Sequence, residues 1–265
     1  SLYLAVWDGA DVLDGGDLTT SSALATVISS SEGGEAVGGA DFDGDGFADL
    51  VVGNDTQGSG DVFVIPGTDF VGGAQLQNAD YAAIEGGSGD ALGVHNGWLA
   101  DLDEDGLPEL VVASSAADGS DTETGVVYVI SGSDVFSGGD VADLSHAWVE
   151  GSTAYGRLAP AGETWGDYDG DGLEELVVSH MGGSAFASIT PTAYAISGTD
   201  LAAGGSIGVE DAMAVFPSRM ADDLYGWSGI SWDANGDGLD DLALGAPANN
   251  NVGAVHVFFS AFSIE

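Results

Sequence analysis

The sequence has no cysteine among its 265 residues, which excludes disulfide bonds and thiolate metal sites. Basic residues are nearly absent as well, with 2 Lys or Arg against 44 acidic residues. Nucleic acids and anionic membranes are bound mainly through Lys and Arg that neutralise phosphate, so we expect neither as a partner. The formal net charge of −42 indicates an acidic, solvated surface that suits high or marine salt; the alternative is an acidic face that attracts a basic partner.

Long apolar runs are also lacking. None reaches membrane-spanning length, so we expect no membrane insertion, and no charged stretch followed by an apolar stretch marks a signal peptide. Because the chain opens directly on a strand-like run, residues 1–7, we expect it to be a mature or excised part of a longer protein. Only 6 prolines occur, but there are 44 glycines, and 44% of the residues are hydrophobic. This composition excludes disorder and collagen and favours an all-β sandwich, barrel or propeller of many short strands.

A nine-residue acidic loop occurs four times, beginning at Asp41, Asp101, Asp167 and Asp233, at intervals of 60, 66 and 66 residues. Each copy has oxygen-bearing side chains at positions 1, 3, 5 and 9, glycine at position 6 and a bulky apolar residue at position 7. Hard oxygen ligands at alternate positions, with a glycine that lets the chain turn sharply, are typical of a calcium loop. We therefore predict one structural Ca²⁺ ion per loop.

The predicted ligands are the side chains at positions 1, 3, 5 and 9 and the backbone carbonyl at position 7: Asp41, Asp43, Asp45, Phe47 and Asp49; Asp101, Asp103, Asp105, Leu107 and Glu109; Asp167, Asp169, Asp171, Leu173 and Glu175; Asp233, Asn235, Asp237, Leu239 and Asp241.

An EF-hand is the main alternative for such loops. It requires an acidic ligand at position 12 and a helix that follows, whereas position 12 here is Val52, Val112, Val178 or Leu244. The residues after each loop form short apolar runs such as 50–53, which predict buried strands. A solvated acidic turn without metal is the other alternative, and four copies of one ligand pattern argue against it.

Two further strand-like elements recur with the same period. An alternating aromatic and β-branched run ends in Ser-Gly or Pro-Gly, as in 126–132, and a second run follows, as in 146–149. With one strand before and one after each loop, the unit has four strands in about 60 residues, which predicts an antiparallel propeller blade. We expect one propeller domain, residues 1–265, with repeat units of approximately 1–60, 61–125, 126–191 and 192–253 and an extra strand in 254–265.

The last unit resembles a known family. Tyr225-Gly226 and Gly245-Ala246-Pro247 stand on either side of the loop at 233–241, in the arrangement of the FG-GAP repeats of the integrin α-subunit propeller and its bacterial relatives. Other units keep only part of this pattern, such as Tyr155-Gly156. The resemblance implies a calcium-stabilised β-propeller of bacterial origin, extracellular or on the cell surface, that serves protein binding or cell adhesion through one face of the ring.

The family usually closes a ring of seven blades, but only four calcium units are present. Three solutions stay open: a piece of a longer propeller, a four-bladed ring that residues 2–7 complete, or a homodimer of two chains that completes the ring.

No set of residues converges on catalysis, so we expect a protein that is not an enzyme. The four histidines lie in different units without metal-ligand spacing, and no Gly-x-Ser-x-Gly turn occurs. The alternatives are a lectin that stacks sugars on Trp98 or Trp165, although both tryptophans are expected to pack between blades, and a polysaccharide lyase or hydrolase. The two basic residues, Arg157 and Arg219, are expected to pair with carboxylates such as Asp222 or Glu163.

Overall fold

The computed structural model describes residues 2–7, 9–14, 19–29, 37–54, 58–77, 80–180, 190–218, 224–247 and 252–260. Its regular structure is nearly all β, and four strand types follow one another in each repeat. Strand 1 precedes an acidic loop, strand 2 follows it, and strands 3 and 4 come next along the chain. Arg219 and Asp222, for which we expected ion pairs, lie outside the described residues.

The strands of each type are as follows. Strand 1 is β3 (Val37–Gly38), β8 (Leu92–Leu99), β13 (Leu158–Gly166) and β18 (Gly229–Trp232); strand 2 is β4 (Leu50–Asn54), β9 (Glu109–Ser114), β14 (Glu175–His180) and β19 (Asp241–Ala246); strand 3 is β1 (Leu2–Val6), β5 (Asp61–Ile65), β10 (Val126–Ile130), β15 (Thr192–Ile196) and β20 (Ala254–Phe258); strand 4 is β2 (Ala25–Ser29), β7 (Ala83–Glu85), β12 (Ser145–Glu150) and β17 (Ala214–Pro217).

The repeat also contains a fifth strand that the sequence did not reveal. β6 (Ala74–Gln77), β11 (Gly139–Asp140) and β16 (Gly205–Gly208) each run parallel to strand 4 of the preceding repeat. Short helical segments lie between strand 3 and strand 4 of each sheet, where we expected simple turns. They are α1 (Gly9–Leu13), η1 (Thr20–Ser22), η2 (Gly67–Asp69), η4 (Gly132–Asp134), α2 (Val141–Leu144), α3 (Gly198–Ala203) and η5 (Val209–Asp211).

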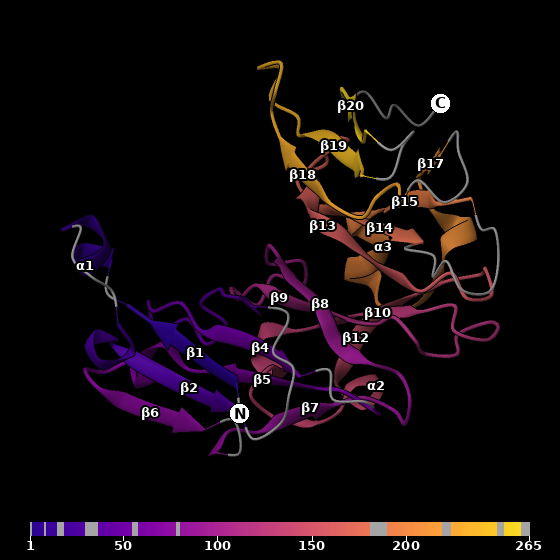
Figure 1. Cartoon of the computed structure of the whole chain (residues 1–265). Helices are drawn as coiled ribbons and strands as arrows, with labels where there is room; N and C mark the ends of the chain where they lie inside the picture. The colour runs from indigo at the N-terminus through magenta and orange to yellow at the C-terminus, as the bar shows by residue number, and fades with distance from the viewer. Residues whose placement is uncertain are drawn as a thin grey trace.

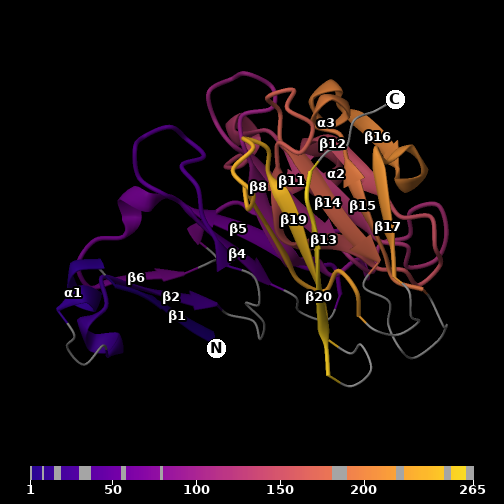
Figure 2. The same ribbon diagram turned by 90° about the horizontal axis from the view of Figure 1, so that it is seen from above.

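The strands form successive sheets along the chain (Figure 1). The first has the order β1-β2-β6, the second β11-β7-β5-β4-β3 and the third β16-β12-β10-β9-β8. The last sheet joins two repeats, β17-β15-β14-β13 and β18-β19-β20, through the single parallel pair Glu163 and Ile230. Within a repeat, strands 1 to 4 are antiparallel, as expected of a propeller blade. Figure 2 shows the first sheet apart at one end of the molecule.

The fold is that of a β-propeller. Among the described residues, three blades have strands 1 to 4, the first sheet has strands 3 and 4, and the β18-β19-β20 part of the last sheet has strands 1 to 3. The four-bladed closure that we considered is not adopted among the described residues, because β1 pairs with β2 and not with any strand of the last sheet. No helix in the described part of the chain is long and apolar enough to cross a membrane.

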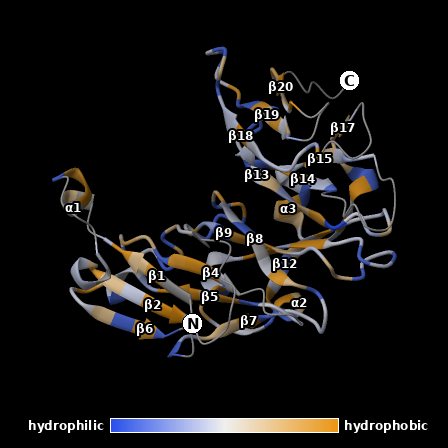
Figure 3. Ribbon diagram, viewed as in Figure 1, coloured by the Kyte–Doolittle hydropathy of each residue, from blue (hydrophilic) through white to orange (hydrophobic). Residues whose placement is uncertain are grey.

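The apolar core lies between consecutive sheets. Strand 2 is buried on both faces because it lies inside the blade, and β9 and β14 are buried throughout; apolar residues follow β4 and β2 in Figure 3. Val127 and Val129 of one blade pack with Leu176 and Val178 of the next. The short apolar runs that follow the loops are therefore buried strands, as predicted, and not helices.

Two tryptophans of strand 1 pack between blades, as the sequence suggested. A Cβ atom added at Gly97 would lie 2.8 Å from the ring of Trp165, and one at Gly38 would lie 3.1 Å from the ring of Trp98. The two indole rings have centroids 5.6 Å apart and are tilted by 51°. Glycine in strand 1 therefore makes room for the tryptophan of the following blade, and neither ring is a free sugar-stacking surface.

Gly97→Ala should therefore destabilise the protein. The new methyl group would clash with Trp165, which the surrounding blades hold in place, so we expect a loss of about 1–3 kcal/mol of unfolding free energy. Chemical denaturation would measure it. Gly72→Ala is the control, because a Cβ there meets nothing within 4 Å, and equal stability of the two variants would contradict this packing.

His180 lies at the end of β14 and is only 1% exposed. Its ring packs edge-on against Tyr194 at a centroid distance of 5.2 Å, and its Nε2 atom is buried without a hydrogen-bond partner. Burial lowers its pKa from 6.5 to about 4. The folded protein therefore holds the neutral ring at pH values where the unfolded chain is already protonated.

The stability that neutral His180 provides should accordingly be lost as the pH falls from 6.5 to about 4. We expect the unfolding free energy of the protein, relative to that of His180→Leu, to fall by about 3 kcal/mol over this interval. Denaturant titrations of both proteins at several pH values would measure the difference. A difference that stays constant with pH would contradict the buried, neutral state.

Candidate metal centres in the strand 1–2 loops

The four acidic loops have the same backbone framework. Side-chain oxygens at positions 1, 3 and 5 accept hydrogen bonds from backbone N–H groups farther along the loop: in the second loop, Asp101 accepts from Gly106 at 2.8 Å, Asp103 from Asp105 at 3.1 Å and Asp105 from Leu107 at 2.8 Å. The glycine at position 6 has φ between 92° and 94° in all four loops, a region that favours glycine. The loop thus turns the side-chain oxygens toward one centre.

The acid at position 9 closes each loop. One carboxylate oxygen accepts from the backbone N–H of position 2: Asp49 from Phe42 at 2.8 Å, Glu109 from Leu102 at 2.6 Å, Glu175 from Tyr168 at 2.8 Å and Asp241 from Ala234 at 2.9 Å. In three loops the second oxygen accepts from the backbone N–H two residues after the end of strand 3, which belongs to Gly67, Gly198 or Ser260. Position 9, which we predicted only as a ligand, therefore also ties the loop to strand 3.

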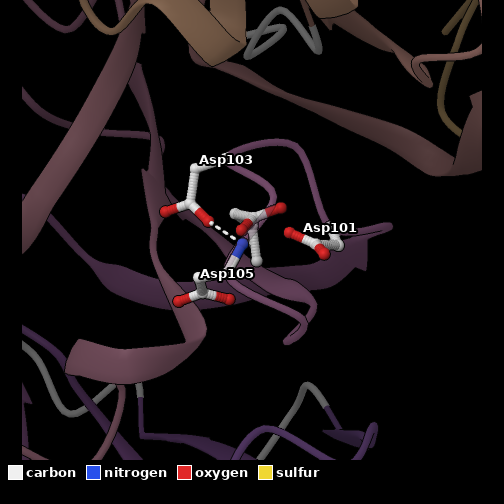
Figure 4. Close-up of side chains that lie close together, drawn as sticks. Asp101, Asp103 and Asp105 are labelled. Atoms are coloured by element: carbon white, nitrogen blue, oxygen red, sulfur yellow. Dashed lines mark hydrogen bonds between the residues drawn. The ribbon is translucent and has the colours of Figure 1, made fainter.

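The second loop gathers all four of its predicted acidic ligands. Asp101, Asp103, Asp105 and Glu109 each place an oxygen within 4.8 Å of the others, and the first three converge in Figure 4. Two oxygens of this group, Glu109 Oε1 and Asp101 Oδ1, are buried without a hydrogen-bond partner. An unpartnered buried carboxylate oxygen is costly in the absence of a cation.

The pKa values of the position-9 acids in the second and third loops also favour a bound cation. Burial, with the nearby carboxylates of Asp103 and Asp101, raises the pKa of Glu109 to about 7. Burial raises the pKa of Glu175 in the third loop to about 7 as well. A divalent cation would offset the repulsion within each group and stabilise the ionised carboxylates.

The first and third loops bring together part of their predicted sets. Asp41, Asp43 and Asp45 form one group, and Asp167, Asp169 and Glu175 form another. Asp49 and Asp171 are absent from these groups: both oxygens of Asp49 accept backbone hydrogen bonds. Asp171 accepts from Leu173 and from the hydroxyl of Thr199.

The fourth loop is held together by its own hydrogen bonds. The Asn235 amide donates to Asp237 Oδ2 at 2.9 Å, and Asp233 accepts from Gly236 at 2.6 Å. Asp241 accepts from Ala234 and from both the backbone and the hydroxyl of Ser260. Asn at position 3 replaces a carboxylate with an amide that can donate a hydrogen bond. This loop therefore has fewer negative charges that repel one another. The carbonyls of Phe47, Leu107, Leu173 and Leu239 stay predicted ligands.

Sequence reasoning missed the acid at position 8 of the last two loops. Glu174 accepts a hydrogen bond from Ala100, at the entrance of the second loop, at 2.7 Å. Asp240 accepts from Asp167, at the start of the third loop, at 3.1 Å. Position 8 is Ala48 or Pro108 in the other two loops, so the acid is not part of the repeated pattern. Only a comparison of the four copies could have pointed to it. These contacts link the loops of neighbouring blades.

The donor set fits a hard divalent cation. All side-chain donors are oxygens, the loops place them at alternate positions, and backbone carbonyls are available to raise the coordination number, which suits Ca²⁺. In the second loop, Asp101, Asp103, Asp105 and Glu109 would hold the ion, which would screen their charges and fix the strand 1–2 turn.

Other residues that we considered for chemistry lie elsewhere. Arg157 forms an ion pair with Glu123 at 2.5 Å, where we expected Asp222 or Glu163 as a partner. Glu123 was missed because it lies in the preceding strand 2–3 loop, and only the fold brings that loop to Arg157. His146 binds the backbone carbonyl of Ala202 at 2.9 Å, and His256 packs edge-on against Tyr225.

Comparison with known families places three of the four loops in repeat units. Residues 41–112 match an FG-GAP-like repeat, and residues 99–130 and 225–258 match the FG-GAP repeat. A search of curated proteins found no match to the chain.

The metal assignment predicts that Asp103→Ala combined with Asp105→Ala reduces the stabilisation by calcium. A ligand at 100 times its Kd stabilises the native state by about 2.7 kcal/mol, so losing one site should reduce the calcium-dependent rise in Tm by several degrees. Thermal unfolding with calcium and with chelator gives this difference. Glu104→Gln is the matched control, since it removes a charge from position 4 of the same loop. If both variants keep the full rise, the second loop is not a calcium site.

Proposed function

We propose that this chain, which is built from FG-GAP repeats, is a calcium-stabilised β-propeller module that binds a protein ligand, as in cell adhesion. The proposal rests on which loops lie on each of the two sides of the blades. In an antiparallel blade, the strand 1–2 loops lie on one side, and the strand 2–3 and 4–1 loops lie on the other. The acidic loops occupy the first side, which leaves the second for a ligand.

Contacts between loops on the second side support this assignment. The strand 2–3 loop at 115–125 and the strand 4–1 loop at 151–157 are joined by backbone hydrogen bonds, from Tyr155 to Thr122 at 2.8 Å and from Arg157 to Glu123 at 3.1 Å. The hydroxyl of Ser120 donates to Gly151 at 2.9 Å. Loops fixed to one another in this way form a preorganised surface, which lowers the entropic cost of binding.

We further propose that the module works outside the cell, on a bacterial surface or as a secreted protein. FG-GAP repeats are typical of extracellular proteins, and calcium loops of extracellular modules are tuned to Kd values of about 10⁻⁴–10⁻³ M. The net charge of −42 would keep such a module soluble in salt.

The positions of the two acids with raised pKa values favour binding over catalysis. Glu109 and Glu175 have the raised pKa values that a general acid needs, but both are buried and bonded to the backbone inside their loops. A structural role in the loops accounts for them. A lectin is the second candidate, because Trp227 leaves 51% of its surface exposed and an exposed indole can stack on a sugar.

The proposal is tested with beads coated with the chain and screened against panels of proteins and of glycans in calcium. We expect binding to a protein that Asp121→Lys, on the second side, reduces at least tenfold in affinity, because charge reversal on the ligand side costs about 1.4 kcal/mol or more. Glu104→Lys, on the calcium side, should leave the affinity unchanged.

Glycan binding that Trp227→Ala abolishes would replace the proposal with the lectin. Turnover of any polysaccharide would replace it with an enzyme. A protein ligand that Glu104→Lys weakens and Asp121→Lys does not would place the site on the other side.

A further inference from the structure

Acids at position 8 of the third and fourth acidic loops hold the start of the loop in the preceding blade. Glu174, which adjoins the predicted ligand Glu175, accepts a hydrogen bond from the backbone N–H of Ala100 at 2.7 Å. Ala100 directly precedes Asp101, whose buried Oδ1 atom has no hydrogen-bond partner. The carboxylate from the third loop therefore fixes the backbone from which an unpartnered oxygen of the second loop projects.

The fourth loop is joined to the third by two such hydrogen bonds. Asp240 donates its backbone N–H to the carbonyl of Asp167 at 3.0 Å, and its carboxylate accepts from the N–H of the same residue at 3.1 Å. A Cβ atom added at Gly166 would lie only 2.7 Å from this carboxylate, so the two segments are in close contact. Asp167 is position 1 of the third loop, and Asp240 adjoins position 9 of the fourth. The two predicted metal centres are thus connected through neighbouring backbone.

The second loop cannot hold the first loop in this way. Its position 8 is Pro108, which has neither a backbone N–H to donate nor a carboxylate to accept. Apolar contact joins these two loops, because a Cβ atom added at Gly44 would lie 3.1 Å from Leu107 Cδ2. The third and fourth loops share this contact, with Leu239 Cδ2 at 3.0 Å from such an atom at Gly170. The position-8 hydrogen bonds therefore distinguish the links among the last three loops from the link to the first.

We infer that the second, third and fourth loops bind calcium cooperatively, whereas the first loop binds its ion independently. An ion in the third loop would order Glu175 at position 9, and with it the adjoining Glu174 that holds the start of the second loop. The second loop then loses less conformational freedom when it binds its own ion, so its affinity rises. Coupling between two binding sites is reciprocal, so an ion in the second loop strengthens binding at the third by the same factor.

Cooperative binding changes how the module responds to calcium. Repulsion between ions in neighbouring loops opposes the coupling, but at about 0.15 M salt the Debye length is only about 8 Å, which weakens the repulsion. Three loops that fill together would raise the stability of their blades over a narrow range of calcium concentration. The inference rests on the proposed calcium-stabilised function and adds to it the order in which the sites fill.

Calorimetric titration of the full chain with calcium chloride, in about 0.15 M salt and with ions counted by native mass spectrometry, tests the inference. Asp169→Ala combined with Asp171→Ala disables the third loop. Two of the three remaining ions should then bind at least about fivefold more weakly, because the second and fourth loops both lose their coupled neighbour. Asp43→Ala combined with Asp45→Ala disables the first loop and should leave the other affinities unchanged. Equal effects of the two double variants, or no effect of either, would overturn the inference.

Variants of position 8 test the route of the coupling and leave every predicted ligand in place. Glu174→Ala should still bind four ions at saturation, but with a less steep binding curve, and disabling the third loop should no longer weaken the second. Glu174→Gln is the matched control, because its amide oxygen can still accept from Ala100, and it should keep the coupling. An unchanged curve for Glu174→Ala, or equal losses in both variants, would overturn the inference.

The same titrations separate this inference from the proposed function. Binding of four ions with independent affinities would overturn the coupling and leave the calcium-stabilised module intact. A chain that binds no calcium would overturn both. The position-8 variants also decide the question if a disabled loop prevents folding, which circular dichroism would reveal, because they retain all of the predicted ligands.

Discussion

The structure depends on carboxylates that are held close together at the strand 1–2 turns. Backbone N–H groups fix the oxygens of each loop, but they leave Glu109 Oε1 and Asp101 Oδ1 buried without partners. A cation would stabilise such an arrangement, because repulsion within the group otherwise opposes folding. An ion bound at the turn would compensate for the side-chain packing that glycines in strand 1, such as Gly97, do not provide.

Packing between blades follows from the same repeat. Gly38 and Gly97 of strand 1 face the tryptophans of the following blades, and Val64 and Val129 of strand 3 pack toward the next sheet. The position-8 acids Glu174 and Asp240 add hydrogen bonds between consecutive loops. Acidic loop, blade and interface are therefore one unit that is repeated along the chain.

Much of this was predictable from local sequence patterns. The loop spacing gave strands 1 and 2, the alternating runs gave strands 3 and 4, and glycine at position 6 follows from the φ that the turn requires. The fifth strand could not be predicted, because β11 is only two residues long and its partner belongs to the preceding repeat. The ion pair of Arg157 with Glu123 and the links made by Glu174 likewise depend on distant segments that only the fold brings together.

Native mass spectrometry of the chain, in calcium and after chelation, tests the central claim most directly. The account predicts four bound Ca²⁺ ions per chain, one for each acidic loop, and their loss on chelation with a fall in stability. A chain that carries no ions in calcium and is equally stable after chelation would contradict it, because the carboxylate groups would then be stable without a cation.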